Sequence, residues 1–149
     1  MASLDDFGKL LTAEHGLVVF CTSRADGSVQ VSLVNAGVLA HPVTGEGVIG
    51  LVARGDAVKL VHLRSRPQST VVVRSGWQWC AAEGPATLVG PNDTIDGFDP
   101  TGVPRLLRDV FVAAGGTHDD WDTYDRVMAE EGRTAVLIRP DRVYANRGA

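Results

Sequence analysis

The chain has 149 residues, the length of one domain with a single core. Its 14 basic and 18 acidic residues give a net charge of −4, which argues against a protein that neutralises a nucleic-acid backbone. No run reaches the roughly 20 apolar residues of a membrane helix, and the N-terminus lacks the basic and apolar regions of a secretory signal. We therefore expect one cytoplasmic domain over residues 1–149, with no nucleic-acid or membrane partner.

The cysteines, histidines and lysines indicate which kinds of site the chain can form. Cys21 and Cys80 lie inside apolar runs and predict no disulfide framework. The four histidines are scattered without the spacing of metal ligands, and we expect no metal site: His15, His41, His62 and His118. Arginine outnumbers lysine by 12 to 2, a skew typical of GC-rich genomes. Lys59 therefore stands out as a position where lysine has been kept.

The first half of the chain predicts two helices and three strands. Residues 3–13 have apolar side chains at helical spacing, and residues 17–22 and 29–33 form a predicted hairpin around a Gly-containing turn. Residues 48–53 are a third strand. Asp56 is expected to cap a helix that ends near Ser65, before Pro67.

The second half predicts more strands and two further helices. Residues 69–73 and 77–89 are strands, and Gly84-Pro85 indicates a bulge or an edge in the second of them. One helix ends at Gly115, and another begins near 117 or 118, with Trp121 and Tyr124 as packing residues. Residues 134–138 and 143–144 supply the last strand, broken at Pro140. About six antiparallel strands with peripheral helices predict an α+β fold built on a small barrel.

Several catalytic motifs can be excluded. Residues 45–50 match the Gly-rich dinucleotide fingerprint, but they enter a strand, whereas the motif must open a helix. No serine lies in a nucleophile elbow, which argues against a serine hydrolase of that type. Glu83 is the one carboxylate inside a predicted strand, which argues against a hydrolase with paired carboxylates. No catalytic side chain is predicted. If the protein is an enzyme, a cofactor is expected to carry the chemistry.

One segment has the features of an anion site. The chain leaves a strand at Ala53, turns at Gly55 and enters a helix, with Arg54 and Lys59 close together beside the helix N-terminus. Basic side chains and free N–H groups at such a position bind phosphate well. The alternative is that Arg54 is a solvated loop residue and Lys59 an ordinary charge on the helix surface.

Two further groups of residues are suited to a flat ligand. Trp77 and Trp79 alternate along a strand and offer adjacent flat surfaces, although a tryptophan pair also fills a barrel core or a subunit interface. Ser32, Val34 and Asn35 end the second strand, where polar groups and backbone can meet the edge of a ring. Residues at strand ends are also often simply exposed.

The order of these segments resembles a known family. The matching segments are 17–36, 57–60, 63–67, 76–79, 82–86, 120–124 and 140–144, which together extend over nearly the whole chain. They resemble the split β-barrel flavin and deazaflavin oxidoreductases related to pyridoxamine 5′-phosphate oxidase, the FMN-binding PNPOx-like fold. More narrowly, they resemble the actinobacterial group B, whose members often use the deazaflavin coenzyme F420.

The resemblance implies a homodimer of split barrels with a cofactor groove on each side of the subunit interface. Lys59 matches the cofactor-phosphate lysine of the family, and Arg54 lies in the same loop. The residues that would line the groove or contact the ring are Ser32, Val34, Asn35, Leu51, Ala53, Ala57 and Val58. Trp77 and Trp79 match aromatic positions near the groove, reached from the same or the partner subunit.

The chain departs from the family at two places. Ala57 stands where many members have a basic residue, and Arg54 is a candidate to compensate. The C-terminal segment 143–149 lacks the arginine- and histidine-containing ending with which true pyridoxamine 5′-phosphate oxidases hold their substrate. Oxidation of pyridoxamine phosphate is therefore not expected.

The sequence leads to one hypothesis and three alternatives. The hypothesis is an F420-dependent oxidoreductase that transfers a hydride between the reduced deazaflavin and a conjugated small organic substrate. The first two alternatives are an FMN-dependent oxidoreductase of the same fold and a flavin- or deazaflavin-binding protein without catalysis. In the third, the basic pair and the tryptophans are only surface and core residues and bind no cofactor. The sequence indicates neither the substrate, nor the reaction direction, nor a proton donor.

Overall fold

The computed structural model describes residues 2–146. Residues 147–149, the end of the C-terminal segment that departs from the family, lie outside the described residues. The described part has seven strands: β1 (Leu17–Ser23), β2 (Val29–Ala40), β3 (Gly47–Ala53), β4 (Gln68–Ser75), β5 (Gln78–Val89), β6 (Thr134–Ile138) and β7 (Arg142–Ala145). It has four α-helices and one short 3₁₀-helix: α1 (Leu4–Ala13), α2 (Val58–Ser65), α3 (Val103–Ala113), α4 (Trp121–Glu130) and η1 (Pro100–Gly102).

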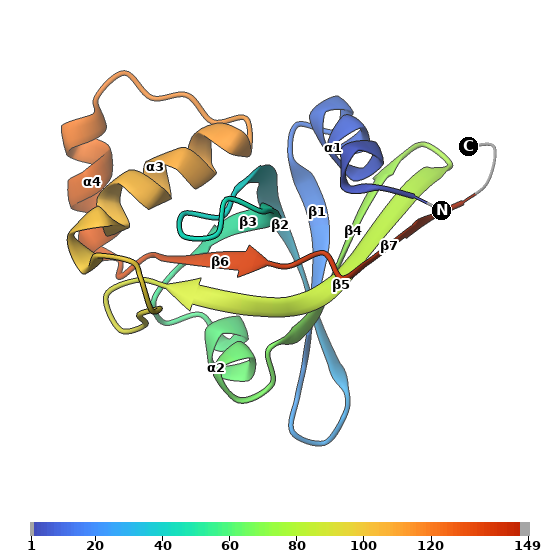
Figure 1. Ribbon diagram of the computed structural model, residues 1–149, viewed down its shortest axis with the longest axis horizontal. Helices are drawn as coiled ribbons and strands as arrows, with labels where there is room; N and C mark the ends of the chain where they lie inside the picture. Colours follow the sequence, from blue (N-terminus) through green and yellow to red (C-terminus); the bar gives the residue numbers. More distant parts are fainter. Residues whose placement is uncertain (1, 147–149) are drawn as a thin grey trace.

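Six of the strands close into an antiparallel barrel. The strand order is β4-β1-β2-β3-β6-β5-β7, and an additional pairing of β4 with β5 joins the two sides (Figure 1). The seventh strand, β7, extends beyond the barrel along β5. This architecture confirms the predicted split β-barrel with peripheral helices.

Two long strands, β2 and β5, change partner along one part of their length, and β5 also pairs with β4. β2 pairs with β1 through residues 29–35 and then with β3 through residues 36–40. β5 pairs with β7 through residues 80–83 and then with β6 through residues 86–89. β2 is therefore much longer than the predicted 29–33, because its second half pairs with β3 and its sequence does not show the polar alternation of its first half.

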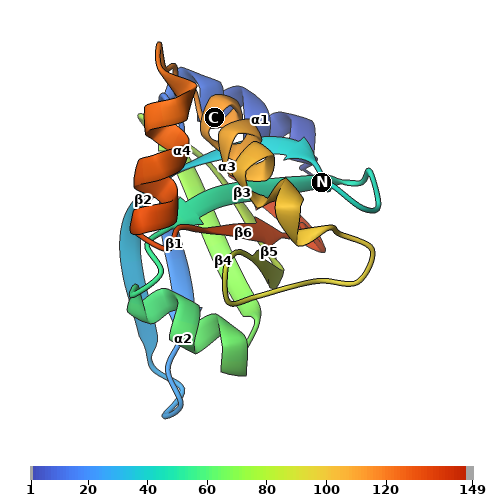
Figure 2. The same ribbon diagram turned by 90° about the vertical axis from the view of Figure 1, so that its left-hand side faces the viewer.

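The core has two parts. One fills the barrel and includes Phe7 of α1, Phe20 of β1, Leu60 of α2 and Ile138 of β6. The other lies between the β3–β6–β5 side of the barrel and helices α3 and α4. α3 packs on β2, β3 and β6 and contacts α4, so these two helices lie together on one side of the barrel (Figure 2).

Three sequence expectations are corrected at the ends of elements. Asp56 does not cap α2: the N-cap is Ala57, without a side-chain cap, because the Asp56 carboxylate binds Arg54 instead. β5 begins at Gln78, so Trp77 lies in the turn and not in the strand. α4 begins at Trp121, because the side chain of Asp120 caps it by accepting the Thr123 backbone N–H.

The Gly84-Pro85 pair shows where β5 changes partner. The β4–β5 ladder passes through both residues without the predicted bulge. On the other side of β5 they face the break between β6 and β7, where the Arg139 N–H donates to the Pro85 carbonyl oxygen at 3.1 Å, so the strand has no open edge there either. In residues 2–146, no helix is long and apolar enough to cross a membrane.

The close packing at Gly84 generates a stability prediction. A Cβ atom at this position would overlap the Arg139 carbonyl oxygen, which belongs to the backbone and cannot rotate away. We expect Gly84→Ala to lower the free energy of unfolding by about 1–3 kcal/mol or more in urea denaturation.

A helical glycine provides the matched control. Gly8 lies within α1, where a Cβ atom would make only an ordinary 3.7 Å contact with Val38. Gly8→Ala is expected to leave stability unchanged or raise it by up to about 1 kcal/mol. Equal urea midpoints for Gly84→Ala and the wild type would contradict the prediction. They would show that the backbone at Arg139, between β6 and β7, leaves room for a Cβ atom at position 84.

Candidate functional site

A cleft of about 670 Å³ lies between the barrel and the helices α2, α3 and α4. The middle of β2 and the end of β3 form its floor, the start of α2 forms one side, and α3 and α4 form the other. Figure 2 shows how these elements are arranged. A cleft of this volume is within the range of small-molecule and cofactor sites, about 300–1,000 Å³. It is therefore large enough for a ring cofactor or for a substrate of similar size.

One end of the cleft is cationic. Arg54, Lys59 and Arg133 all line it, and Asp56 is the carboxylate among the lining residues. Arg54 and Lys59 come from the β3–α2 turn and the first turn of α2, whereas Arg133 follows α4. Because α2 begins without a side-chain cap, its first N–H groups remain available for an anion.

Two backbone turns bring these cations together. The Gly55 N–H donates to the Glu131 carbonyl oxygen at 3.1 Å, which joins the β3–α2 turn to the α4–β6 turn. A Cβ atom at Gly55 would lie 2.7 Å from the Gly132 carbonyl oxygen, and Gly132 itself has a φ of 61°. Both positions therefore require glycine for this approach.

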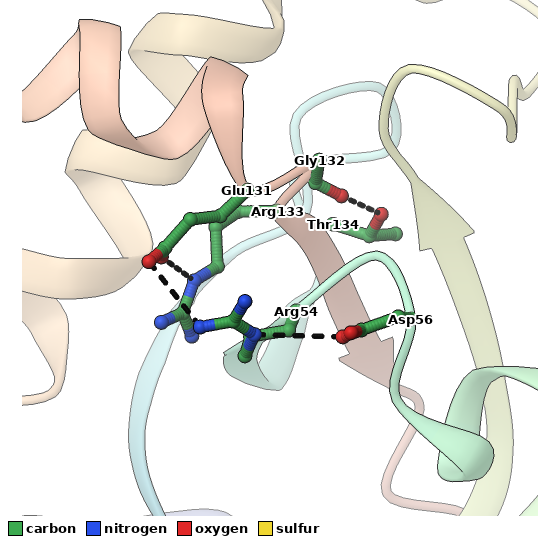
Figure 3. Close-up of polar contacts among 6 residues, drawn as sticks. All are labelled: Arg54, Asp56, Glu131, Gly132, Arg133 and Thr134. Carbon is green, nitrogen blue, oxygen red and sulfur yellow. Dashed lines mark hydrogen bonds and ion pairs between the residues drawn. The ribbon is translucent and has the colours of Figure 1, made fainter.

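Glu131 links the two arginines at this end (Figure 3). Its Oε1 accepts the Arg133 Nε–H at 2.8 Å, and its Oε2 accepts an Arg54 Nη1–H at 3.3 Å. Asp56 accepts the Arg54 Nε–H at a longer 3.4 Å. The two guanidinium groups are thus held by carboxylates of the protein itself.

Lys59 has a different environment. In residues 2–146 its ammonium group has no salt bridge or side-chain hydrogen bond, and the side chain is half-buried. Burial lowers the pKa of Lys59, because removing the ammonium group from water costs free energy. An unpaired, partly desolvated cation on a cleft wall is well placed to bind an anion.

The opposite wall is apolar. Val110, Phe111 and Ala114 of α3 and its C-terminus face the cleft together with Met128 of α4. Tyr124 also lines it but is 5% exposed, and its hydroxyl donates to the Leu107 carbonyl oxygen at 3.2 Å. This wall offers packing for a flat, conjugated ring and leaves polar recognition to the other residues.

The floor is formed by the middle of β2 and the end of β3. The expectation that Ser32, Val34 and Asn35 end the second strand is wrong, because β2 continues to Ala40 by pairing with β3. Val34 and Asn35 of β2 and Ala53 of β3 line the cleft. The Asn35 side-chain amide donates to the His15 carbonyl oxygen at 3.1 Å. His15 has a φ of 57°, unusual for a residue other than glycine, so this bond fixes a strained turn beside the cleft.

The cleft brings together six of the eleven predicted site residues: Val34, Asn35, Ala53, Arg54, Ala57 and Lys59. Three others lie near it without lining it. Leu51 is fully buried between β2 and β6, Ser32 is half-buried two residues before Val34, and the Val58 side chain is 49% exposed. Leu51 has paired strands on both sides, so the structure does not place it in the cleft as the sequence predicted.

The two tryptophans lie elsewhere in the chain. Trp77 and Trp79 line a separate hollow with Arg74 at the β4–β5 turn, at the other end of the molecule from α3 and α4 (Figure 1). Trp77 is 93% exposed. The Asn146 side chain accepts the Trp79 N–H at 2.9 Å and donates to the Trp77 carbonyl oxygen at 2.8 Å. Within one chain these residues do not reach the cleft.

Sequence analysis missed several residues of the cleft. Arg133 follows a helix end, and its place beside Arg54 depends on contacts between positions about 80 apart in the chain. His15 was considered only as a metal ligand, and Tyr124 only as a packing residue, which its burial confirms. The glycine after α4 is the single local signal of a tight turn there.

Comparison with known proteins identifies the fold. The sequence matches no protein-family model and no curated protein. Among solved structures, the conserved hypothetical protein Rv2991 of Mycobacterium tuberculosis is 19% identical with a TM-score of 0.69, covering 97% of this chain and 84% of that one. A pyridoxamine 5′-phosphate oxidase-related, FMN binding protein of Nostoc punctiforme is 10% identical with a TM-score of 0.67, over the same shares.

A third structure, described as an F420 reductase, is 17% identical with a TM-score of 0.57 and covers 86% of this chain and 88% of that one. The chain therefore has the split β-barrel fold of pyridoxamine 5′-phosphate oxidase-like proteins. Its structural neighbours include both FMN-binding and F420-related proteins.

The unpaired lysine leads to a prediction about stability. At pH 7 Lys59 carries its proton in the folded and the unfolded chain, but burial makes the charged form less favourable in the folded chain. We therefore expect Lys59→Met to raise the free energy of unfolding at pH 7. As pH rises through the lowered pKa toward the ordinary 10.5, the wild type loses this penalty and the difference shrinks.

The second lysine of the chain is the control. Lys9 is exposed on α1, and Lys9→Met is expected to change the free energy of unfolding by less than about 0.5 kcal/mol. Urea denaturation at pH 7 and near pH 10.5 measures both variants. A loss of stability in Lys59→Met at pH 7 would contradict the assignment of Lys59 as an unpaired, desolvated cation.

Proposed function

We propose that the protein is an F420-dependent oxidoreductase of the group B type, transferring a hydride between reduced deazaflavin and a conjugated small organic substrate. The observation that carries the proposal is the cleft, which combines an unpaired cation at one end with an apolar wall along the other. This arrangement fits a ligand that has both a phosphate and a flat ring. The fold, shared with an F420 reductase, supports the same assignment.

The residues of the chain would bind and orient, while F420, when bound, supplies the hydride. Lys59 would neutralise the phosphate, assisted by Arg54 and the uncapped first turn of α2. The backbone at Val34, Asn35 and Ala53 would position the edge of the ring. Phe111, Met128 and their apolar neighbours on α3 and α4 would exclude water from its face.

FMN is the second candidate cofactor. The same fold is found in a protein described as FMN binding, and the cleft has the cations that an FMN phosphate would need. Either cofactor also fits a protein that binds without catalysis. The cofactor preference and the turnover of an acceptor therefore distinguish these three functions.

We further propose that the protein is a homodimer. The outer faces of β1 and β2 carry five exposed apolar side chains: Leu17, Val19, Val29, Val31 and Leu33. A group of this kind on adjacent strands is typical of a surface that another molecule covers. Because Leu17 is the register partner of Asn35, this face borders the cleft, as expected for cofactor grooves at a subunit interface.

The proposed dimer also accounts for the exposed position of Trp77 and Trp79. Trp77 projects from the β4–β5 turn with nearly all of its surface exposed, and Asn146 holds the backbone on both sides of Gln78. We propose that this turn contributes Trp77 and Trp79 to the groove of the partner subunit. The small-molecule substrate would then lie against the ring, at the open side of the cleft.

The cofactor assignment predicts a binding result. In titrations followed by tryptophan fluorescence, oxidised F420 is expected to bind in the low micromolar range, with a binding free energy of about −8 kcal/mol, and FMN more weakly. Lys59→Gln should weaken F420 binding about 10- to 100-fold, because a charge-assisted contact to the phosphate is lost.

Lys9→Gln is the matched control and should bind like the wild type. A preference for FMN would move the assignment to the second candidate. Stoichiometric F420 binding without reduction of any conjugated acceptor would indicate a carrier. If Lys59→Gln binds F420 as tightly as the wild type, the phosphate does not lie at Lys59.

The dimer proposal predicts a change of mass. Light scattering should give twice the 15.8 kDa of one chain for the wild type and a single chain mass for Leu33→Glu, which places a charge within the apolar face. Val43→Glu, at an exposed apolar position in the β2–β3 turn, is the control and should remain dimeric. A monomeric wild type would contradict the proposal.

A further inference from the structure

The charge at the cationic end of the cleft is almost balanced. Arg54, Lys59 and Arg133 line the cleft and contribute three positive charges. Two negative charges come from Asp56, which also lines it, and from Glu131, which lies behind the lining and pairs with both arginines. The unliganded group therefore has one net positive charge. A ligand with a single negative charge would balance it, whereas a second negative charge would remain uncompensated.

Of the two carboxylates, Glu131 lowers the positive charge of the cationic end more effectively than Asp56. Its side chain and that of Arg133 are each 26% exposed, so their interaction is less screened by water than that of a surface pair. Asp56, in contrast, has 80% of its side chain exposed and lies 3.4 Å from Arg54. Solvent therefore weakens the effect of Asp56 far more than that of Glu131.

The backbone also holds Glu131 in place. It is the C-cap residue of α4, and its carbonyl oxygen accepts the Gly55 N–H. Its carboxylate is bound on both sides by arginines from different elements (Figure 3). The side chain is thus a fixed part of the cationic end and not a mobile surface group.

We propose that Glu131 determines the class of phosphate that the cleft accepts, favouring a monoanionic phosphodiester over a dianionic phosphomonoester. Coulomb repulsion from a fixed carboxylate grows in proportion to the charge of the ligand. A phosphomonoester carries about −1.5 to −2 at neutral pH, whereas a diester carries one negative charge. The inference rests on the proposed function, because F420 has a phosphodiester and FMN a phosphomonoester.

Glu131→Gln is the variant that tests the proposal. It removes the negative charge and keeps an amide oxygen that can still accept from one arginine. Fluorescence titrations with F420, FMN and riboflavin separate the contribution of the phosphate from that of the ring, because riboflavin is FMN without its phosphate. Glu130→Gln, at the exposed neighbouring position that pairs with Arg126, is the matched control.

The expected result is a selective gain for the phosphomonoester. In Glu131→Gln the affinity for FMN should rise about fivefold or more relative to both riboflavin and F420, and Glu130→Gln should leave these ratios unchanged. Unchanged ratios in Glu131→Gln, or a selective loss of FMN affinity, would overturn the proposal. A wild type that prefers FMN would overturn the F420 assignment instead.

A second arm does not depend on any ring cofactor. Methyl phosphate, a dianion at pH 8, and dimethyl phosphate, a monoanion, are titrated while the Nε–H signals of Arg54 and Arg133 are followed by NMR. Glu131→Gln should increase the affinity for methyl phosphate more than that for dimethyl phosphate. Equal changes would overturn the proposal even if the wild type binds neither F420 nor FMN, an outcome that would by itself refute only the proposed function.

Discussion

The contact between two backbone turns underlies the whole candidate site. The β3–α2 turn and the α4–β6 turn approach so closely that glycine is required at positions 55 and 132, and one N–H···O=C bond joins them. This contact brings Arg133 beside Arg54 and sets the cationic end of the cleft against the start of α2. Without it, the basic residues would be separate surface charges.

The site also shows how binding and stability oppose each other. Lys59 is half-buried without a partner, and two arginines are held by carboxylates in the same region. The first arrangement costs folding free energy and leaves a cation free for a ligand. The second stabilises the arginines and limits how much negative charge a ligand can bring. A cleft with both features is suited to one phosphate of low charge.

Local pattern was sufficient for most of the fold and for about half of the site. Strand alternation, turn residues and helical spacing predicted the barrel, and the loop after β3 indicated Arg54 and Lys59. Arg133 was missed because its role depends on packing between distant segments, and the capping role given to Asp56 failed because Arg54 competes for its carboxylate. The flat side chains of Trp77 and Trp79 indicated a contact with a ring ligand. Within one chain they do not reach the cleft, so such a contact would require a partner subunit.

A crystal structure of the protein with bound F420 would test the central claim most directly. The account predicts the phosphate within hydrogen-bond distance of the Lys59 Nζ atom, with the ring between the backbone at Val34 and Ala53 and the apolar wall of α3 and α4. A ligand bound at another surface, or a phosphate directed away from Lys59, would contradict the account.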